Sequence, residues 1–506
     1  MVDLSKSEFK DLKFLRPYLK SNGSKKHERL FESIYRQIYP IVKRKKKRVH
    51  KKAILSSIEM LIVNLYSAHH VHKCKYLAVS RTKNDYDSSN RYTNPNVGYA
   101  SVILVLDTFY ELKLLSQMHI GYFDEINDVS YETLVRASQV LSRKISRAFQ
   151  QSDEMTESGQ ETIILRTAKK RDGDFQLVDY VDDESTIAMR SNLERINKAI
   201  SNASLNIHLS DNELKALNKN LKESLDRKPI DYSRCNLVRI FNEGSFDLGG
   251  RFYRGWWQEL PKRFRKFIEI NNSMTVEYDY SSLHPMLVYS RYGLDLINDP
   301  YFIEGFEDMR KFVKVGFNMM LNATNWHAAK GAIEKEWKVF CEKNPVFSGR
   351  SFDTEELMNL IEVKHFKIAS AFYTGVGKEL QRIDSDIAEE VMLSMLDDGY
   401  VVLPVHDSFI VDTYARSLLH QTMVNIAKKK FSIDFKVDKK EEEIEVINND
   451  RIKSGLSEWH WGAADFITDE EKGPEEEYSH YFSRRREEVS RRDQAQCAIS
   501  STINLN

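Results

Sequence analysis

The spacing of apolar residues predicts a chain that alternates between helical and strand-like segments. In the first half, apolar residues recur at helical intervals over Ala53–His69, Ala100–Ser116, Ser130–Ser138, Ala188–Ile200 and Asp211–Leu225. Alternation marks Glu161–Ala168 and Phe175–Tyr180 as two strands of a hairpin. The order helix, turn, helix, hairpin over residues 98–182 is typical of a winged helix-turn-helix, whose second helix enters the major groove of DNA. A purely structural α+β unit is the alternative.

The second half of the chain carries a different pattern. Alternation over Thr275–Tyr280 predicts a strand, and helices are expected at Pro285–Tyr292 and Met309–Asn322. Residues Tyr400–Asp412 are apolar on two arms and predict a hairpin with His406 and Asp407 at its tip. A helix at Ala415–Lys429 and a strand at Phe431–Val437 are expected to follow.

Length and composition limit the class of protein. The chain has 506 residues, of which 41% are hydrophobic and 30% charged, so it is too long for one ordinary core and too apolar for a disordered chain. Its 75 basic and 75 acidic residues cancel, which excludes a uniformly basic protein that coats nucleic acid. Any basic surface must therefore be local.

One basic segment stands out near the N-terminus. Eight of the ten residues from Lys43 to Lys52 are Lys or Arg. Such a cluster is either a solvated surface or a patch that contacts phosphate groups. We favour nucleic-acid binding by Lys43, Arg44 and Lys45, because an overall neutral chain concentrates its positive charge there.

The cysteine and histidine pattern argues against a zinc site. The four cysteines form no CxxC pair, and the spacing of His69, His70, His72 and Cys74 fits no standard zinc motif. The chain begins without the apolar core of a signal peptide and has no apolar run long enough to span a bilayer. We expect a cytoplasmic protein with no membrane partner, associated with the nucleoid if it is bacterial.

Two carboxylates lie at predicted strand ends. Asp279 ends the first strand and Asp407 lies in the hairpin turn, where a charged side chain among apolar residues needs a partner or a metal. Two such carboxylates suit a two-metal site for phosphoryl transfer. Between them, Arg310 and Lys314 share one helix face, either as a solvated surface or as a clamp for a triphosphate.

Taken in this order, the segments resemble the polymerase core of family A DNA polymerases and of the related single-subunit phage-type RNA polymerases. The segment Gly249–Tyr253, followed by Trp257–Pro261, is similar to the segment that precedes the first carboxylate in that family. The resemblance spans roughly residues 240–440, under half of the chain. It implies an α+β right-hand polymerase fold with palm, fingers and a short thumb.

The resemblance also implies roles for particular residues. Asp279 and Asp407 would hold two Mg²⁺ ions, or Mn²⁺ in their place, and His406, Arg310 and Lys314 would complete the catalytic set. The residues expected to bind the nucleoside triphosphate are Tyr280, His284, Asn318 and Asn322. The residues expected to bind the DNA primer–template are Arg251, Gln258 and Gln381.

The sequence departs from the family at the sugar-selecting positions. His284 stands five residues after Asp279, where family A DNA polymerases have Glu and the RNA polymerases have Gly. A ring at this position can exclude a ribose 2′-hydroxyl by bulk, which favours deoxynucleotides. Against this, Asn322 replaces the tyrosine of the fingers helix, and Ser408 follows Asp407 as in the RNA polymerases.

These observations predict five regions: a basic helical segment at 1–97, a winged-helix segment at 98–185, thumb-like helices at 186–240, palm and fingers at 241–445, and a charged tail at 446–506. The expected function is a template-directed DNA polymerase of a phage or mobile element, without proofreading, since neither DxE match lies on a predicted strand. A short thumb would call for an accessory or priming protein. The alternatives are an RNA polymerase or primase of the same fold, or a DNA-binding replication initiator.

Overall fold

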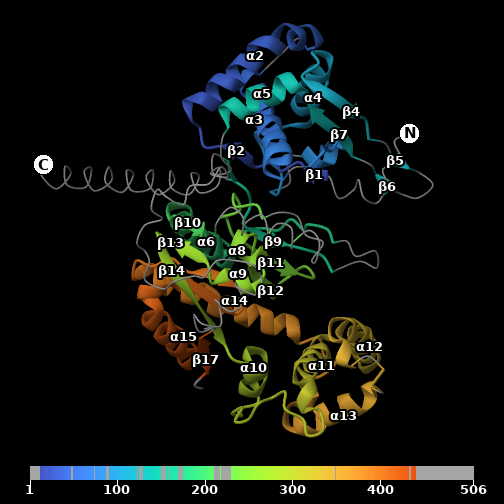
Figure 1. The fold of residues 1–506 in the computed structure, drawn as a ribbon, viewed down its shortest axis with the longest axis vertical. Coiled ribbons are helices and arrows are strands. Elements are labelled where there is room, and N and C mark those ends of the chain that lie inside the picture. The colour runs from blue at the N-terminus through green and yellow to red at the C-terminus, as the bar shows by residue number, and fades with distance from the viewer. Residues whose placement is uncertain are drawn as a thin grey trace, which may run out of the picture.

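The protein has two hydrophobic cores that follow one another along the chain. The computed structural model describes residues 12–439, apart from gaps at 47–49, 73, 87–90, 122, 125–128, 131, 150–154, 158, 169–174, 210–229 (except Leu217 and Leu221), 348, 351 and 432–434. The first core runs from Leu19 to Met155 and the second from Ile163 to Phe435. Figure 1 shows the first core at one end of the molecule, the sheet of the second core in the middle and helices α11–α13 at the other end.

The first core packs helices against a four-stranded sheet with the order β1-β3-β7-β4. Its strands are β1 (Leu12–Phe14), β3 (Tyr76–Val79), β7 (Thr133–Ala137) and β4 (Leu115–His119). Its helices are α2 (Lys25–Lys45), α3 (Lys51–Tyr66), α4 (Tyr99–Glu111) and α5 (Gln139–Ala148). Two short strand pairs are β2 (Leu19–Ser21) with β8 (Met155–Glu157) and β5 (Phe123–Asp124) with β6 (Val129–Ser130).

Because Val97 and Val102 lie in the same core, the expected boundary between residues 97 and 98 does not separate two domains.

The predicted winged helix is wrong. The expected recognition helix at Ser130–Ser138 is instead strand β7, which lies between β3 and β4 in the sheet. Thr133 and Val135 are β-branched and fully buried in this strand, and β-branched residues favour a pleated surface over a helix. The hairpin is formed only in part, by the bridge between Arg166 and Leu177, while β9 (Ile163–Leu165) pairs with a strand of the second core.

The second core is built on an antiparallel sheet with the order β10-β13-β14-β16-β15, in which β17 also pairs with β14. Its strands are β10 (Leu205–Ile207), β13 (Ile268–Ile270), β14 (Ser273–Tyr280), β15 (Leu403–Val405), β16 (Ser408–Asp412) and β17 (Val437–Lys439). The helices of this region are α6 (Glu184–Asn202), α8 (Trp256–Glu259), α9 (Lys262–Arg265), α10 (Leu283–Arg291), α14 (Gly377–Asp397) and α15 (Arg416–Phe431). Helix α6 buries Met189, Leu193 and Ile196 in this core, and the second expected thumb helix lies outside the described residues.

A separate group of helices extends the second core. These are α11 (Arg310–Asn322), α12 (Trp326–Lys343) and α13 (Thr354–Lys364). Phe312, Trp337 and Phe352 pack ring against ring between α11, α12 and the start of α13, with Trp337 and Phe352 stacked at 4.2 Å. Short 3-10 and π segments lie at Ser67–Val71, Lys83–Tyr86, Glu307–Met309, Pro345–Phe347, Phe366–Ala371 and Thr413–Ala415.

A buried guanidinium joins the antiparallel ribbon of a three-stranded sheet to α14. The ribbon is β11 (Val238–Asn242) with β12 (Ser245–Tyr253), and β9 pairs with β11 in parallel. Arg239 on β11 is fully buried and donates to the carbonyl of Gly250 at 2.9 Å, to Ser385 at 2.9 Å, to Glu389 at 2.9 Å and to Asp386 at 3.0 Å. Loss of hydration lowers the pKa of Arg239, while Glu389 opposes that effect. The ribbon and the helix are therefore held at a fixed separation.

The close approach of β12 to α14 requires glycine. Gly250 has a φ of 77°, and a Cβ atom there would lie 2.7 Å from the Phe241 ring and 2.9 Å from the Ser385 hydroxyl. Gly249 also has a positive φ of 86°, and the pairing register shifts beside it. Only glycine adopts such a conformation at no steric cost, so the pair forms a bulge that directs the next residue, Arg251.

Ion pairs connect the first core to the second. Arg16 pairs with Glu157 at 2.6 Å and with the buried Asp231 at 2.5 Å, and Lys13 lies 3.6 Å from the same Asp231 carboxylate. Although burial alone would raise it, Arg16, His72 and Lys13 hold the pKa of Asp231 well below its usual range. Burial lowers the pKa of Lys13 to about 8, because Asp231 offsets only part of the lost hydration.

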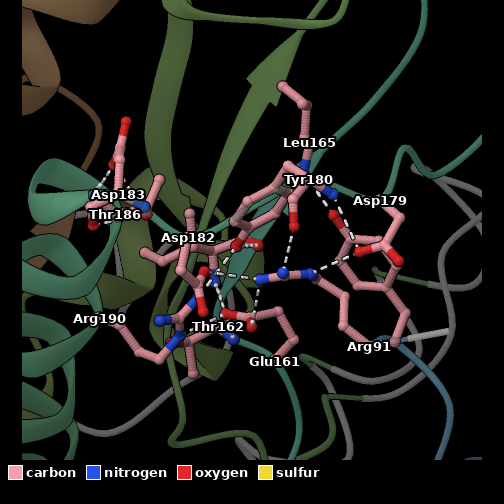
Figure 2. Close-up of polar contacts among 12 residues, drawn as sticks. Arg91, Glu161, Thr162, Leu165, Asp179, Tyr180, Asp182, Asp183, Thr186 and Arg190 are labelled. Atoms are coloured by element: carbon pink, nitrogen blue, oxygen red, sulfur yellow. Dashed lines mark hydrogen bonds and ion pairs between the residues drawn. The ribbon is translucent and has the colours of Figure 1, made fainter. Parts of the chain in front are cut away.

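A second set of contacts surrounds Arg91 (Figure 2). Its guanidinium lies over the ring of Tyr180 at 3.6 Å and pairs with Asp179 at 2.8 Å and with Asp182 at 2.9 Å. Arg190 on α6 reaches the same Asp182 at 2.8 Å and Glu161 at 3.1 Å. The segment 178–183 is thereby held between a loop of the first core and a helix of the second.

Replacement of Arg239 by Met should destabilise the second core by about 3–5 kcal/mol, because Glu389 would lose its buried partner. The measurement is urea unfolding followed by the fluorescence of the buried Trp256 and Trp257. Arg195→Met is the control, since Arg195 forms an exposed pair with Asp397 and should cost no more than about 1 kcal/mol. Equal losses in the two variants would contradict this role for Arg239.

Lys13 should make stability depend on pH. Its pKa is about 8 in the folded protein against 10.5 for an unperturbed lysine, so between these limits the unfolded chain binds the proton more tightly. The wild-type protein should therefore gain on the order of 2 kcal/mol relative to Lys13→Met between about pH 7 and about pH 9.5. Urea unfolding at both pH values measures the difference. The exposed Lys26→Met should show none, and parallel pH profiles for wild type and Lys13→Met would refute the assignment.

Candidate active site

Strands β14 and β16 bring the two predicted metal-binding residues to neighbouring backbone positions. Asp279 pairs with Ser408 in the antiparallel register, and the amide of Tyr280 lies 3.5 Å from the carbonyl oxygen of Asp407. His406 and Asp407 form a two-residue turn between β15 and β16, with a φ of 59° at His406. Asp279 and Asp407 are both half-buried. Residues 128 positions apart in sequence therefore occupy neighbouring positions at one end of the sheet.

Further polar residues support the face that carries Asp279. Glu277, two residues earlier on the same face, receives two hydrogen bonds of 3.0 Å from Arg265 and one of 2.7 Å from Ser408. On the other side of β14, Asp438 of β17 is the register partner of Asp279. Asp438 accepts a hydrogen bond from Ser281, and this bond and then Lys436 hold the pKa of Asp438 below its usual value. Sequence reasoning missed Asp438 because the predicted strand ended at residue 437.

The donor atoms at this end of the sheet fit Mg²⁺. Carboxylate oxygens are hard ligands, and Mg²⁺ is usually held by one or two carboxylates together with the phosphates of its substrate. Asp279 and Asp407 supply two such carboxylates. Among the described residues, no group of three or more His, Cys, Asp or Glu side chains could hold a metal. This result also covers the described members of the His69–Cys74 segment.

The basic residues of α11 lie beside a buried tyrosine. Arg310 and Lys314 each stand 5.5 Å from the ring centre of Tyr301, and the Ser282 hydroxyl is near enough to the Tyr301 hydroxyl to lower its pKa slightly against the effect of burial. Burial raises the pKa of Tyr301 to about 12, and the negative charge of Asp407 is near enough to add to this effect. Tyr301 thus connects the basic face of α11 to the turn after Asp279. Sequence reasoning missed it because it lies in a loop without a periodic pattern.

Arg310 already has an anionic partner. It donates twice to Asp299, once at 2.9 Å through its terminal nitrogen and once through Nε. Partial burial would raise the pKa of Asp299, but these hydrogen bonds leave it below its usual value. Lys314 is exposed and lies against the Tyr301 ring. A phosphate group would therefore meet Lys314 directly and would compete with Asp299 for Arg310.

A second cluster flanks the Asp407 turn. Arg251 donates to Asp384 through Nε at 2.7 Å and to Nε2 of His284 at 3.2 Å. The ring of Tyr253 packs edge to face with His406 at 5.9 Å. Partial loss of hydration and then the positive charge of Arg251 lower the pKa of His406. His406 is therefore neutral near pH 7, which suits a positioning role better than that of a permanent cation.

Tyr280 does not belong to the site. Successive side chains of a strand point to opposite faces, so Tyr280 lies on the face away from Asp279. Its side chain is 1% exposed and its hydroxyl donates to the Met423 carbonyl on α15 at 2.7 Å. The predicted nucleotide contact of Tyr280 is therefore wrong. The prediction followed proximity in sequence and ignored the alternation of the strand.

The remaining predicted residues are placed as follows. Asn318 and Asn322 lie on α11, and Asn322 donates to the Asn318 carbonyl at 2.7 Å. The Gln258 amide donates to the carbonyls of Phe252 and Pro404, each at 3.0 Å, so it joins β12 to β15. Gln381 is half-buried on α14.

The basic segment at residues 43–45 belongs to the first core, whereas strands β14 and β16 belong to the second. Lys43, Arg44 and Lys45 form the last turn of α2 and are exposed, and Lys45 pairs with Glu111 at 2.6 Å. Nucleic-acid binding by these residues stays a prediction. The middle of the basic run, residues 47–49, lies outside the described residues, as does the charged tail.

Comparison with protein-family models gives no match, and comparison with curated proteins gives no relative. The resemblance to family A polymerases therefore depends on the motifs and their order alone. In the described part of the chain, every helix is too short or too polar to cross a bilayer.

Proposed function

We propose that this protein is a template-directed nucleotidyltransferase, and that it is a DNA polymerase. The observation that carries the proposal is the placement of Asp279 and Asp407 at neighbouring positions on the β14–β16 ladder. Tyr301 links this pair to the basic face of α11 through Ser282, Arg310 and Lys314. Paired carboxylates beside two cations suit the transfer of a group that carries several phosphates.

In the proposed reaction, the 3′-oxygen of a growing strand forms a bond to the α-phosphorus of a nucleoside triphosphate. The bond from that phosphorus to the bridging oxygen breaks, pyrophosphate leaves, and the proton of the 3′-hydroxyl passes to solvent. Asp279 and Asp407 would hold Mg²⁺, which lowers the pKa of the attacking hydroxyl and neutralises charge on the leaving group. Lys314 would bind the β- and γ-phosphates and can give a proton to the leaving oxygen, while Arg310 would exchange Asp299 for phosphate.

Two alternative functions are an RNA polymerase or primase of the same fold and a DNA-binding replication initiator. An RNA polymerase or primase would use the same carboxylates, and the choice of nucleotide separates it from a DNA polymerase. A replication initiator drew its support from the winged helix, which the structure replaces with β7. The proposed partners remain a DNA primer–template, nucleoside triphosphates and an accessory or priming protein.

Asp407→Asn should abolish Mg²⁺-dependent extension of a labelled primer on a DNA template, with a loss of at least about 100-fold in rate. The fold should survive, because Asp407 lies in a hairpin turn and is half-buried. Asp412→Asn, at the far end of the same hairpin, is the matched control and should keep its rate. Near-normal extension by Asp407→Asn would show that the carboxylate pair is not the catalytic site.

Lys314→Ala should lower the rate constant for nucleotide addition by about 10²–10³, since a cation that meets developing phosphate charge acts mainly in the transition state. Lys311 is exposed on the same helix, whereas, among the described residues, Arg310 and Lys314 are the cations that lie against the Tyr301 ring, so Lys311→Ala provides the control. Single-turnover kinetics over a range of dNTP concentrations separate the effect on rate from that on binding. If both variants lose activity equally, general positive charge rather than the position of Lys314 matters.

A further inference from the structure

We propose that Asp384 is a positioning residue which, through Arg251, fixes the ring of His284 and so sets the choice between deoxyribose and ribose. The inference rests on the proposed function and extends it to a residue that the sequence pattern does not single out. Three elements meet here, since Arg251 comes from β12, His284 from the first turn of α10 and Asp384 from the middle of α14.

The contacts form a short chain from a buried carboxylate to the histidine ring. Asp384 is 2% exposed and its Oδ2 accepts two hydrogen bonds from Arg251, one at 2.7 Å through Nε and one through a terminal nitrogen. The same terminal nitrogen lies 3.2 Å from Nε2 of His284. The side chains of Arg251 and His284 are 18% and 17% exposed, so both are close to solvent and can reach a bound substrate.

These contacts define the orientation of the ring. A guanidinium can only donate hydrogen bonds, so Nε2 of His284 accepts the bond from Arg251. The Asp384 carboxylate thus holds Arg251 through two hydrogen bonds, and Arg251 holds one orientation of His284.

The position of the cluster points to the sugar of the nucleotide. His284 follows Ser282, whose φ of 55° starts α10 and whose hydroxyl contacts Tyr301 under the two cations of α11. The ring of Tyr253, two residues after Arg251 on β12, packs against the ring of His406 at 5.9 Å, which places the cluster beside the Asp407 turn. The sugar is joined to the α-phosphate by one oxygen, so a nucleotide bound at the carboxylates must place its ribose in this vicinity.

The backbone around Asp384 leaves little freedom for the carboxylate to move. Ser385, the next residue on α14, receives a hydrogen bond from the buried Arg239 and packs against Gly250, the residue before Arg251. Both ends of the Arg251–Asp384 pair are therefore anchored by the same contact between β12 and α14. A side chain held in this way can exclude a 2′-hydroxyl by its bulk, whereas a freely rotating ring could yield to it.

The test measures sugar choice in a double-mutant cycle. Primer extension with dNTPs and with rNTPs gives the ratio of the two kcat/KM values for wild type, Asp384→Asn, His284→Ala and the double variant. Asp384→Asn should lower the preference for dNTPs by about tenfold, and it should have no further effect when His284 is already Ala. A merely structural role would lower both kcat/KM values and leave their ratio unchanged.

Two further variants keep the test decisive. Asp397→Asn removes a carboxylate from an exposed ion pair on the same helix and should leave the ratio unchanged. Arg251→Lys keeps the charge but loses the bidentate fork, so it should shift the ratio as Asp384→Asn does, even if the latter folds poorly. An unchanged ratio in Asp384→Asn and Arg251→Lys, or a shift that persists without His284, overturns the inference alone. Failure of the wild-type protein to extend a primer with either nucleotide overturns the proposed function as well.

Discussion

The buried guanidinium of Arg239 is the interaction on which the arrangement of the second core depends. It satisfies two carboxylates, a hydroxyl and a carbonyl at once, and it does so with no exposed surface. A charge in such a place is tolerated only where its hydrogen bonds are complete. The ribbon β11–β12 therefore cannot slide along α14 without leaving both Arg239 and Glu389 without a partner.

The same constraint reaches the candidate site through two glycines. Gly250 allows β12 to approach α14 closely, and the bulge that it forms with Gly249 turns Arg251 toward Asp384 and His284. On the opposite side, the β14–β16 ladder fixes Asp279 beside Asp407. Asp279 and Asp407, proposed to bind the metal, thus belong to the β14–β16 ladder. Arg251 and Asp384, proposed to act on sugar choice, belong to β12 and α14. Helix α10, which begins directly after β14, joins them through His284.

Charge also determines how the first core meets the second. In the Arg16 cluster, Arg16 of the first core pairs with Asp231. In the Arg91 cluster, Arg91 of the first core pairs with Asp179 and Asp182. The Arg16 cluster is buried, so its contribution depends on the loss of hydration by Lys13 and Asp231. The Arg91 cluster is more open to solvent, and its cation stacks on Tyr180. This difference means that salt should screen the second cluster more than the first.

Much of the second core could be predicted from the sequence because its pattern is local. The structure contains the expected helices at Pro285–Tyr292 and Met309–Asn322, because each has a clear apolar period. It also contains the expected hairpin, because His406 and Asp407 lie between two apolar arms at the point where the chain reverses. The first core was harder, because β7 contains residues that fit either a helix or a strand until the neighbouring strands are known.

The sequence by itself determined which residue types are available for the chemistry: two carboxylates at strand ends and two cations one helical turn apart. Only the tertiary structure decided their partners. It placed Asp384 against Arg251 across 133 positions of sequence, Asp299 against Arg310, and the Tyr280 side chain in the core. Periodicity reports which face of an element is buried, whereas long-range pairing depends on how close two elements can approach, and here Gly250 and Arg239 control that distance.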